Sequence, residues 1–158
     1  MRNLWTILRR AMRCEAGTAS LEAVIMLPVL ISLMVGGIEI GRILSADATV
    51  NKTMRNATRY LASVPREAVC GWGFTNAQNL AVYGQISGGS TPVLPGFTPA
   101  MVTRFAPSSC VGLTEPVVIG LRASVPYTVF MLSALGFSNT RTITAAHQER
   151  HIDPQIDP

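Results

Sequence analysis

Residues 13–42 read RCEAGTASLEAVIMLPVLISLMVGGIEIGR, and this stretch decides how the chain is organised. Between Glu22 and Glu39 the sequence carries no charge. A helix from one glutamate to the other would be roughly 25 Å long, which approaches the ~30 Å hydrocarbon core of a bilayer. We therefore predict a transmembrane helix over residues 18–43.

Pro28 lies inside this apolar stretch. A proline removes one helical hydrogen bond, which a membrane helix tolerates, and it usually leaves a kink. We therefore predict a helix kink at Pro28, and Gly36 and Gly37 would allow another helix to approach closely. The alternative is a buried core helix of a soluble domain. It is disfavoured because the remaining chain is too short and too polar to cover a helix that is apolar on all sides.

Basic charge is concentrated ahead of the apolar stretch. The net charge is +4, and the leader, residues 1–17, contributes four arginines and one glutamate, which leaves 4 − 3 = +1 for the rest of the chain. That remainder lacks the clustered Lys and Arg of a nucleic-acid surface, so we expect no nucleic-acid partner. We interpret the leader as the cytoplasmic flank of the membrane helix.

The chain has three cysteines, Cys14, Cys70 and Cys110. Two cysteines in a small exported domain are commonly bridged, so we predict a disulfide between Cys70 and Cys110 and a free thiol at Cys14. No ligand-spaced partners surround these cysteines, so we expect no metal site. Basic residues lie on both sides of the span, and the cysteine pair therefore decides the orientation, with the N-terminus cytoplasmic and the C-terminal part periplasmic.

Helical periodicity continues beyond the span. Apolar residues recur at spacings of three and four from Ile43 to Leu61. We therefore predict that the membrane helix extends outward as an amphipathic helix ending near Pro65. A second helix is predicted over residues 76–83, with a capping box formed by Thr75 and Gln78 and with Gly84 as its stop.

Strand patterns follow a loop at residues 87–99 that is rich in Gly, Pro, Ser and Thr. We expect strands at residues 100–105, 117–130 and 141–147, with Pro126 at a sheet edge or a bulge. Antiparallel strands packed on the outward helix give an α+β fold, a long N-terminal transmembrane helix that continues into a small helix-plus-antiparallel-sheet domain. This domain spans residues 44–151, and residues 152–158 form a loose tail.

No catalytic constellation stands out, so we expect neither an enzyme nor a bound cofactor. His147 and His151 are four residues apart, which would suit a metal on a helix, but the strand pattern around them predicts surface histidines instead. We interpret Trp72, Phe74 and Tyr83, which lie near Cys70 in the sequence, as local packing.

Glu22 stands five residues beyond Gly17, at the start of the apolar helix. An ionised carboxylate near a bilayer is unfavourable, by up to a few kcal/mol when it lies deeper, and so it needs a partner. If a peptidase cuts after Gly17, the new amino group on Thr18 of a neighbouring subunit could pair with Glu22. Glu39 is interpreted as an anchor at the membrane interface beside Arg42, three residues along the same helix.

The same stretch resembles the N-terminal signature of TadE-like proteins, minor pseudopilins of the tight-adherence (Tad, or Flp) pilus machinery. The resemblance rests on Gly17 to Ala23 (GTASLEA), Leu27-Pro28 and residues 38–42 (IEIGR), and Ala23 departs from the phenylalanine common in the family. It implies a type IV pilin-like subunit of the bacterial inner membrane with a pilin-like periplasmic domain. It also implies cleavage by a prepilin peptidase between Gly17 and Thr18, although some relatives remain uncut.

The partners implied by this resemblance are other pilin or pseudopilin subunits, the Tad inner-membrane machinery, the prepilin peptidase and membrane lipid. The leading interpretation is therefore a minor pilin or pseudopilin that acts in assembly of a Tad-type pilus. Two alternatives remain. One is an unprocessed single-pass anchor that binds envelope partners. The other is a secreted soluble domain released by signal peptidase after Leu44-Ser45-Ala46.

Overall fold

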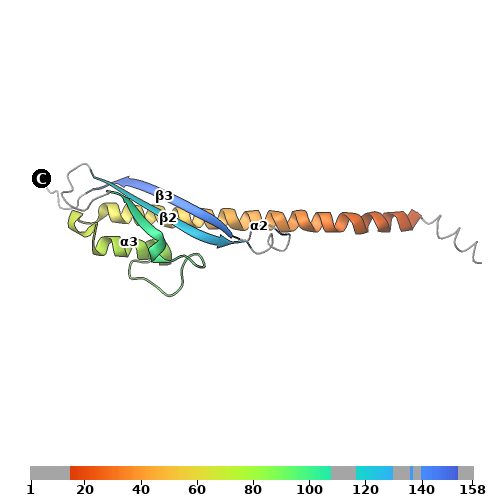
Figure 1. The fold of residues 1–158 in the computed structure, drawn as a ribbon, viewed down its shortest axis with the longest axis horizontal. Helices are drawn as coiled ribbons and strands as arrows, with labels where there is room; N and C mark the ends of the chain where they lie inside the picture. The colour runs from red at the N-terminus through yellow and green to blue at the C-terminus, as the bar shows by residue number, and fades with distance from the viewer. Residues whose placement is uncertain (1–14, 108–116, 130–135, 137–139, 153–158) are drawn as a thin grey trace, which may run out of the picture.

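The computed structural model describes residues 15–107, 117–129, 136 and 140–152 of the chain (Figure 1). One long helix, α2 (Glu15–Ser63), runs through the whole molecule, and a small domain packs against its C-terminal half. This domain contains α3 (Trp72–Tyr83) and three strands, β1 (Val102–Ala106), β2 (Val118–Thr128) and β3 (Thr140–Arg150). Two short 3-10 helices, η1 (Arg66–Ala68) and η2 (Pro99–Met101), complete it. The predicted α+β fold with a long N-terminal apolar helix is confirmed.

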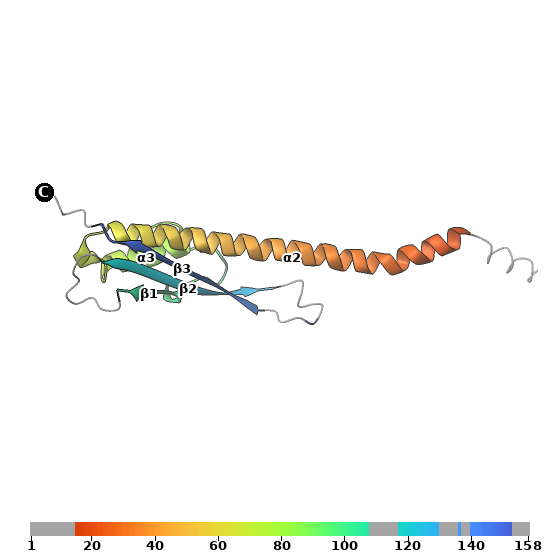
Figure 2. The same cartoon turned by 90° about the horizontal axis from the view of Figure 1, so that it is seen from above.

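The N-terminal half of α2 stands free of the domain (Figures 1 and 2). Its most apolar stretch of 18 residues has a mean hydropathy of 2.3 and is only 6% buried. By length and composition this helix can cross a membrane. The alternative of a core helix is wrong, because the described residues do not cover the apolar stretch.

Pro28 lies inside α2, and Figure 2 shows this helix bent in its free N-terminal half. The hydroxyl of Ser32 donates a hydrogen bond of 2.8 Å to the carbonyl oxygen of Pro28. Such a bond from a side chain to the carbonyl four residues back often bends a helix, and a proline in the same turn adds to this effect. The site at Pro28 therefore combines two independent causes of bending.

The C-terminal half of α2 forms one wall of the core. Its apolar stripe follows the predicted spacing, and four of its side chains have no exposed surface: Val50, Met54, Ala57 and Leu61. The opposite wall is β2, the central strand, whose inward residues alternate as predicted and are likewise fully buried: Ile119, Leu121, Ala123 and Val125. α2 ends at Ser63, close to the end predicted from Pro65, because a proline disfavours the helical conformation of the residue before it.

The sheet is antiparallel in the order β1-β2-β3. β3 pairs with the whole of β2, from Val118↔Arg150 to Thr128↔Thr140. β1 pairs only with residues 120–123 of β2. Pro126 therefore lies beyond the part of β2 that pairs with β1. One side of β2 is unpaired there, so Pro126 is at a sheet edge, as predicted.

Helix α3 begins earlier than the sequence predicts. It starts at Trp72, and its N-cap is Gly71, so the predicted capping box is wrong. The reason is the turn from η1, in which the Gly71 N–H bonds to the carbonyl of Ala68 and leads directly into the helix. Gln78 instead donates to the carbonyls of Pro99 and Val102, both at 3.0 Å. The predicted stop is confirmed, since Gly84 is the C-cap in the left-handed conformation with φ of 73°.

The end of β3 is fixed to the end of α2. His151 is only 3% exposed, and its Nε2 lies 2.9 Å from the carbonyl oxygen of Val64. The backbone N–H of Ile152 donates to the carbonyl of Ala62 at 2.9 Å. The prediction of a surface histidine is therefore wrong for His151, because β3 runs three residues beyond its predicted end at His147 and carries His151 under the helix end. The predicted loose tail begins at Ile152, whose backbone is instead hydrogen-bonded to Ala62, and the rest of it, residues 153–158, lies outside the described residues.

Candidate functional site

Glu22 lies on the free part of α2 and is exposed. With Leu21, Ile25 and Met26 it lines a shallow hollow of about 300 Å³ on the helix surface. Within the described residues its carboxylate forms no ion pair. Gly17 and Thr18 lie in the first turns of α2, so the helix continues across the predicted cleavage site. The structure therefore places Glu22 where a second molecule can reach it.

A continuous apolar surface surrounds Glu22. Large hydrophobic side chains that are each about half exposed or more cover α2 from its second turn to its middle: Leu21, Val24, Ile25, Met26, Leu27, Val29, Leu30, Ile31, Leu33, Met34, Ile38, Ile40 and Leu44. A soluble monomer rarely exposes so large an apolar area, so this surface marks a membrane or a protein interface. Lipid, neighbouring helices or both are needed to cover it.

Glu39 is in a different environment from Glu22. Its side chain has no exposed surface, and neither carboxylate oxygen has a hydrogen-bond partner among the residues that the structure describes. Arg42, three residues along the helix, is exposed and forms no ion pair with it. The sequence contains a pattern that indicates this burial, and the interpretation of Glu39 as an interfacial anchor did not take it into account. Residues 39, 43, 46 and 50 share one helical face, so Glu39 extends the buried stripe of Ala46 and Val50 by two turns.

We expect Glu39→Gln to stabilise the folded domain. A carboxyl group without any partner loses its hydrogen bonds to water when the domain folds, and an uncharged amide of the same size reduces this penalty. A gain of about 1 kcal/mol would raise the midpoint of thermal unfolding by roughly 4–8 °C in a domain of this size. The midpoint can be measured by circular dichroism of the full chain in detergent.

The matched control is Glu149→Gln. Among the described residues, Glu149 forms one long ion pair, 4.0 Å from Arg59, whose side chain is 72% exposed. Glu149→Gln should therefore leave the midpoint within about 2 °C of the parent. A lower midpoint for Glu39→Gln would show that the carboxylate has a stabilising partner.

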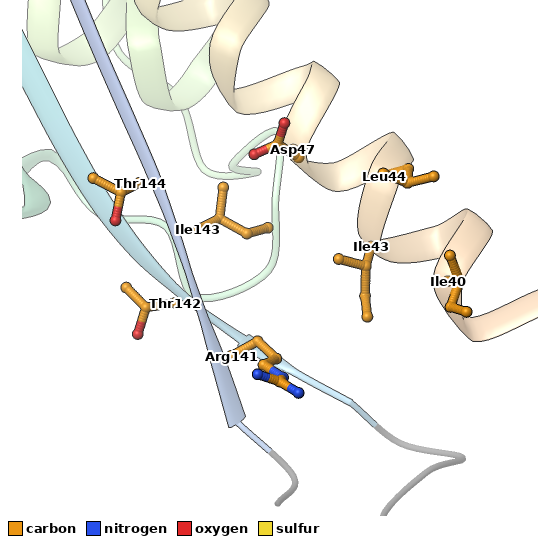
Figure 3. A pocket seen from close by; sticks show the side chains of 8 residues that line it. All are labelled: Ile40, Ile43, Leu44, Asp47, Arg141, Thr142, Ile143 and Thr144. Atoms are coloured by element: carbon orange, nitrogen blue, oxygen red, sulfur yellow. The ribbon is translucent and has the colours of Figure 1, made fainter. Parts of the chain in front are cut away.

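A pocket of about 420 Å³ lies between α2 and the start of β3 (Figure 3). Its lining combines apolar side chains from both elements with one acid, Asp47, and one base, Arg141. Sequence reasoning missed both charged residues. The alternation of the strand could have identified Arg141. It lies on the same face of β3 as the buried residues Ile143 and Ala145, where an apolar residue is expected.

Cys70 is half-buried against the core and is disulfide-bonded. The partner predicted for it, Cys110, and the predicted free thiol at Cys14 lie outside the described residues. Phe74 and Tyr83 pack against the core as predicted, whereas Trp72 is 57% exposed and does not.

The described residues contain no group of three or more His, Cys, Asp or Glu side chains that could hold a metal ion. His147 and His151 therefore do not form part of a ligand cluster there. The features that remain are an exposed apolar helix, an accessible carboxylate at Glu22 and the pocket beside Arg141. These features suit assembly and membrane contact.

Comparison with known families agrees with this geometry. The model of the family described as TadE-like protein matches residues 17–59, which cover the exposed apolar part of α2, Glu22, Glu39 and the first turns packed on the sheet. Neither the curated proteins nor the solved structures include a significant match to the chain. The match confirms the resemblance seen in the sequence: residues 17–59 are similar to the family of TadE-like proteins.

Proposed function

We propose that this protein is a minor pseudopilin that acts in assembly of a Tad-type pilus. The observation that carries the proposal is the free half of α2, an exposed apolar helix with one accessible carboxylate near its start. Its match to the TadE-like family supports the same conclusion. In this proposal the free half spans the inner membrane as a single pass, and the small domain lies in the periplasm.

The orientation is supported by the oxidised state of Cys70. Stable disulfides form in the periplasm and are rare in the reducing cytoplasm. The domain that carries Cys70 would therefore lie outside the cytoplasmic membrane, and the basic leader would lie inside, in agreement with the positive-inside rule.

Glu22 would act in subunit assembly. After cleavage between Gly17 and Thr18, the amino group of Thr18 in one subunit would lie at the membrane depth of Glu22 in the next. The attraction between two opposite charges is stronger at the membrane edge than in bulk water, because the dielectric constant is lower there. The pairing would fix the axial position of one helix against its neighbour, while apolar contacts supply the packing.

Intact mass spectrometry of the membrane-extracted protein tests processing. In a host with prepilin peptidase we expect the mature chain to begin at Thr18, and in a peptidase-deficient host we expect it to begin at Met1. A Met1 terminus in both hosts would reject cleavage and favour the alternative of an unprocessed anchor. The observation that favours this second function is the helical continuity of α2 across Gly17 and Thr18 in the uncut chain.

The alternative of a secreted soluble domain has less support. Cleavage after Ala46 would cut within α2 at a residue whose side chain belongs to the core. Carbonate extraction of membranes separates this alternative from the other two, because only a released domain would appear in the soluble fraction.

A further inference from the structure

The charged residues of the pocket between α2 and β3 occupy different levels along the helix. β3 runs in the same direction as α2, since Glu149 lies beside Arg59 and Ile152 bonds to Ala62 near the helix end. The start of β3 is therefore the end of the strand nearest the free half of α2. Arg141 lies at that end of the pocket, and Asp47 lies at the other end, farther from the free half (Figure 3).

Between these two charges the pocket is mostly apolar. Ile43 and Leu44 of α2 and Ile143 of β3 line it, together with the two threonines of β3 that flank Ile143, Thr142 and Thr144 (Figure 3). Asp47 accepts a hydrogen bond of 3.1 Å from the side-chain amide of Asn51, which leaves one carboxylate oxygen available. No salt bridge joins Arg141 to Asp47 in the part of the chain that the structure describes. A base and an acid thus border an apolar pocket without neutralising each other.

The pocket opens where the apolar surface of α2 ends. Ile40 and Leu44, which line it, are 56% and 64% exposed and continue the free apolar face. If the free half of α2 spans the bilayer, this level corresponds to the outer membrane–water boundary, where lipid headgroups lie. Tyr127, the cross-strand partner of Arg141, belongs to a residue type that is enriched at this boundary.

We propose that this pocket binds the headgroup of a zwitterionic aminophospholipid, with the Arg141 guanidinium on the phosphate and the Asp47 carboxylate on the ammonium. The order of the charges supports this occupant. In a phospholipid of the outer leaflet the acyl chains point into the membrane, the phosphate lies at the boundary, and the ammonium lies at the same level or farther out. The pocket presents apolar Ile40, then Arg141, then Asp47 in the same order. The guanidinium is the side chain best suited to phosphate recognition.

Native mass spectrometry of the full chain in detergent, titrated with single phospholipids, tests this inference. We expect phosphatidylethanolamine to bind more tightly than phosphatidylcholine, whose quaternary ammonium has no N–H to donate, and than phosphatidylglycerol, which has no cation. Loss of one charge-assisted hydrogen bond corresponds to about tenfold in affinity. Arg141→Gln should weaken all three lipids by about that factor, and Asp47→Asn should remove only the preference for phosphatidylethanolamine.

Arg59→Gln is the matched control, since Arg59 is an exposed arginine of α2 that lies outside the pocket, and it should change no lipid affinity. Equal binding of the three lipids by the parent, or an unchanged preference in Asp47→Asn, would overturn the proposal. A dimer whose formation Arg141→Gln abolishes would instead assign the pocket to a second copy of the chain.

This inference rests on the proposed membrane placement of α2, and carbonate extraction tests that placement separately. A chain that is released from membranes would refute the proposed function. A chain that stays in the membrane and shows no lipid preference would refute only the headgroup site.

Discussion

Replacing Glu22 with alanine is expected to reduce pilus assembly by about tenfold or more while leaving membrane insertion intact. The variant removes one carboxylate from the start of the free apolar helix and leaves the apolar surface in place. A neighbouring subunit's amino group would then lie near the membrane without its partner, and loss of one such pair in a low-dielectric setting costs a few kcal/mol. Assembly can be measured as sheared pilin per cell, together with carbonate extraction of the variant.

Glu67→Ala is the matched control, because Glu67 is an exposed glutamate of η1 in the small domain, far along the chain from the free helix. It should assemble as the parent does. Normal piliation in Glu22→Ala would contradict the pairing role, and loss of the protein from membranes would show that Glu22 acts in insertion instead.

The second large effect is expected at the disulfide of Cys70. In the chain-entropy account, a bridge to Cys110 closes a loop of about 40 residues and stabilises the folded domain by roughly 4 kcal/mol. Cys70→Ala and Cys110→Ala should therefore each lower the free energy of unfolding by about that amount. The double variant should be no less stable than either single variant, because both changes remove the same bond. Denaturant unfolding of the full chain in detergent measures all three.

Cys14→Ala is the control for this series, since the leader is expected to keep its thiol free. It should leave the free energy of unfolding unchanged. A loss in Cys14→Ala that equals the loss in Cys70→Ala, with Cys110→Ala unaffected, would assign the bridge to Cys14 and would overturn the predicted pairing.

Two kinds of sequence signal were sufficient for the fold. The uncharged interval from Glu22 to Glu39 predicted a helix long enough to span a membrane, and the spacing from Ile43 to Leu61 predicted its continuation to the domain. Alternation in residues 117–125 predicted the inner face of β2. These features repeat over many residues, so an error at one position does not alter the conclusion. The resemblance to TadE-like proteins rests on the same stretch and was also available from the sequence.

Single positions near the ends of elements were predicted less well. The sequence placed the start of α3 at residue 76 because Thr75 and Gln78 match a capping box, but the turn after η1 starts the helix at Trp72. It placed His151 on the surface, but the packing of the end of β3 against α2 buries this residue. For α3 the turn directly before the helix outweighs the capping pattern, and for His151 a contact with a segment distant in the chain outweighs the strand pattern.

The sequence by itself determined that a charged leader, an apolar helix and a small α+β domain follow one another, because periodicity and charge are properties of neighbouring residues. Only the tertiary structure determined which residues come together where α2 packs against the sheet. There β3 begins close to the part of α2 that carries Ile40 and Asp47, so Arg141 faces an open pocket. Glu39, next to Ile40, is buried with no hydrogen-bond partner among the described residues. Residues about 100 positions apart share this region, and their proximity depends on strand register and helix packing, which no local pattern encodes.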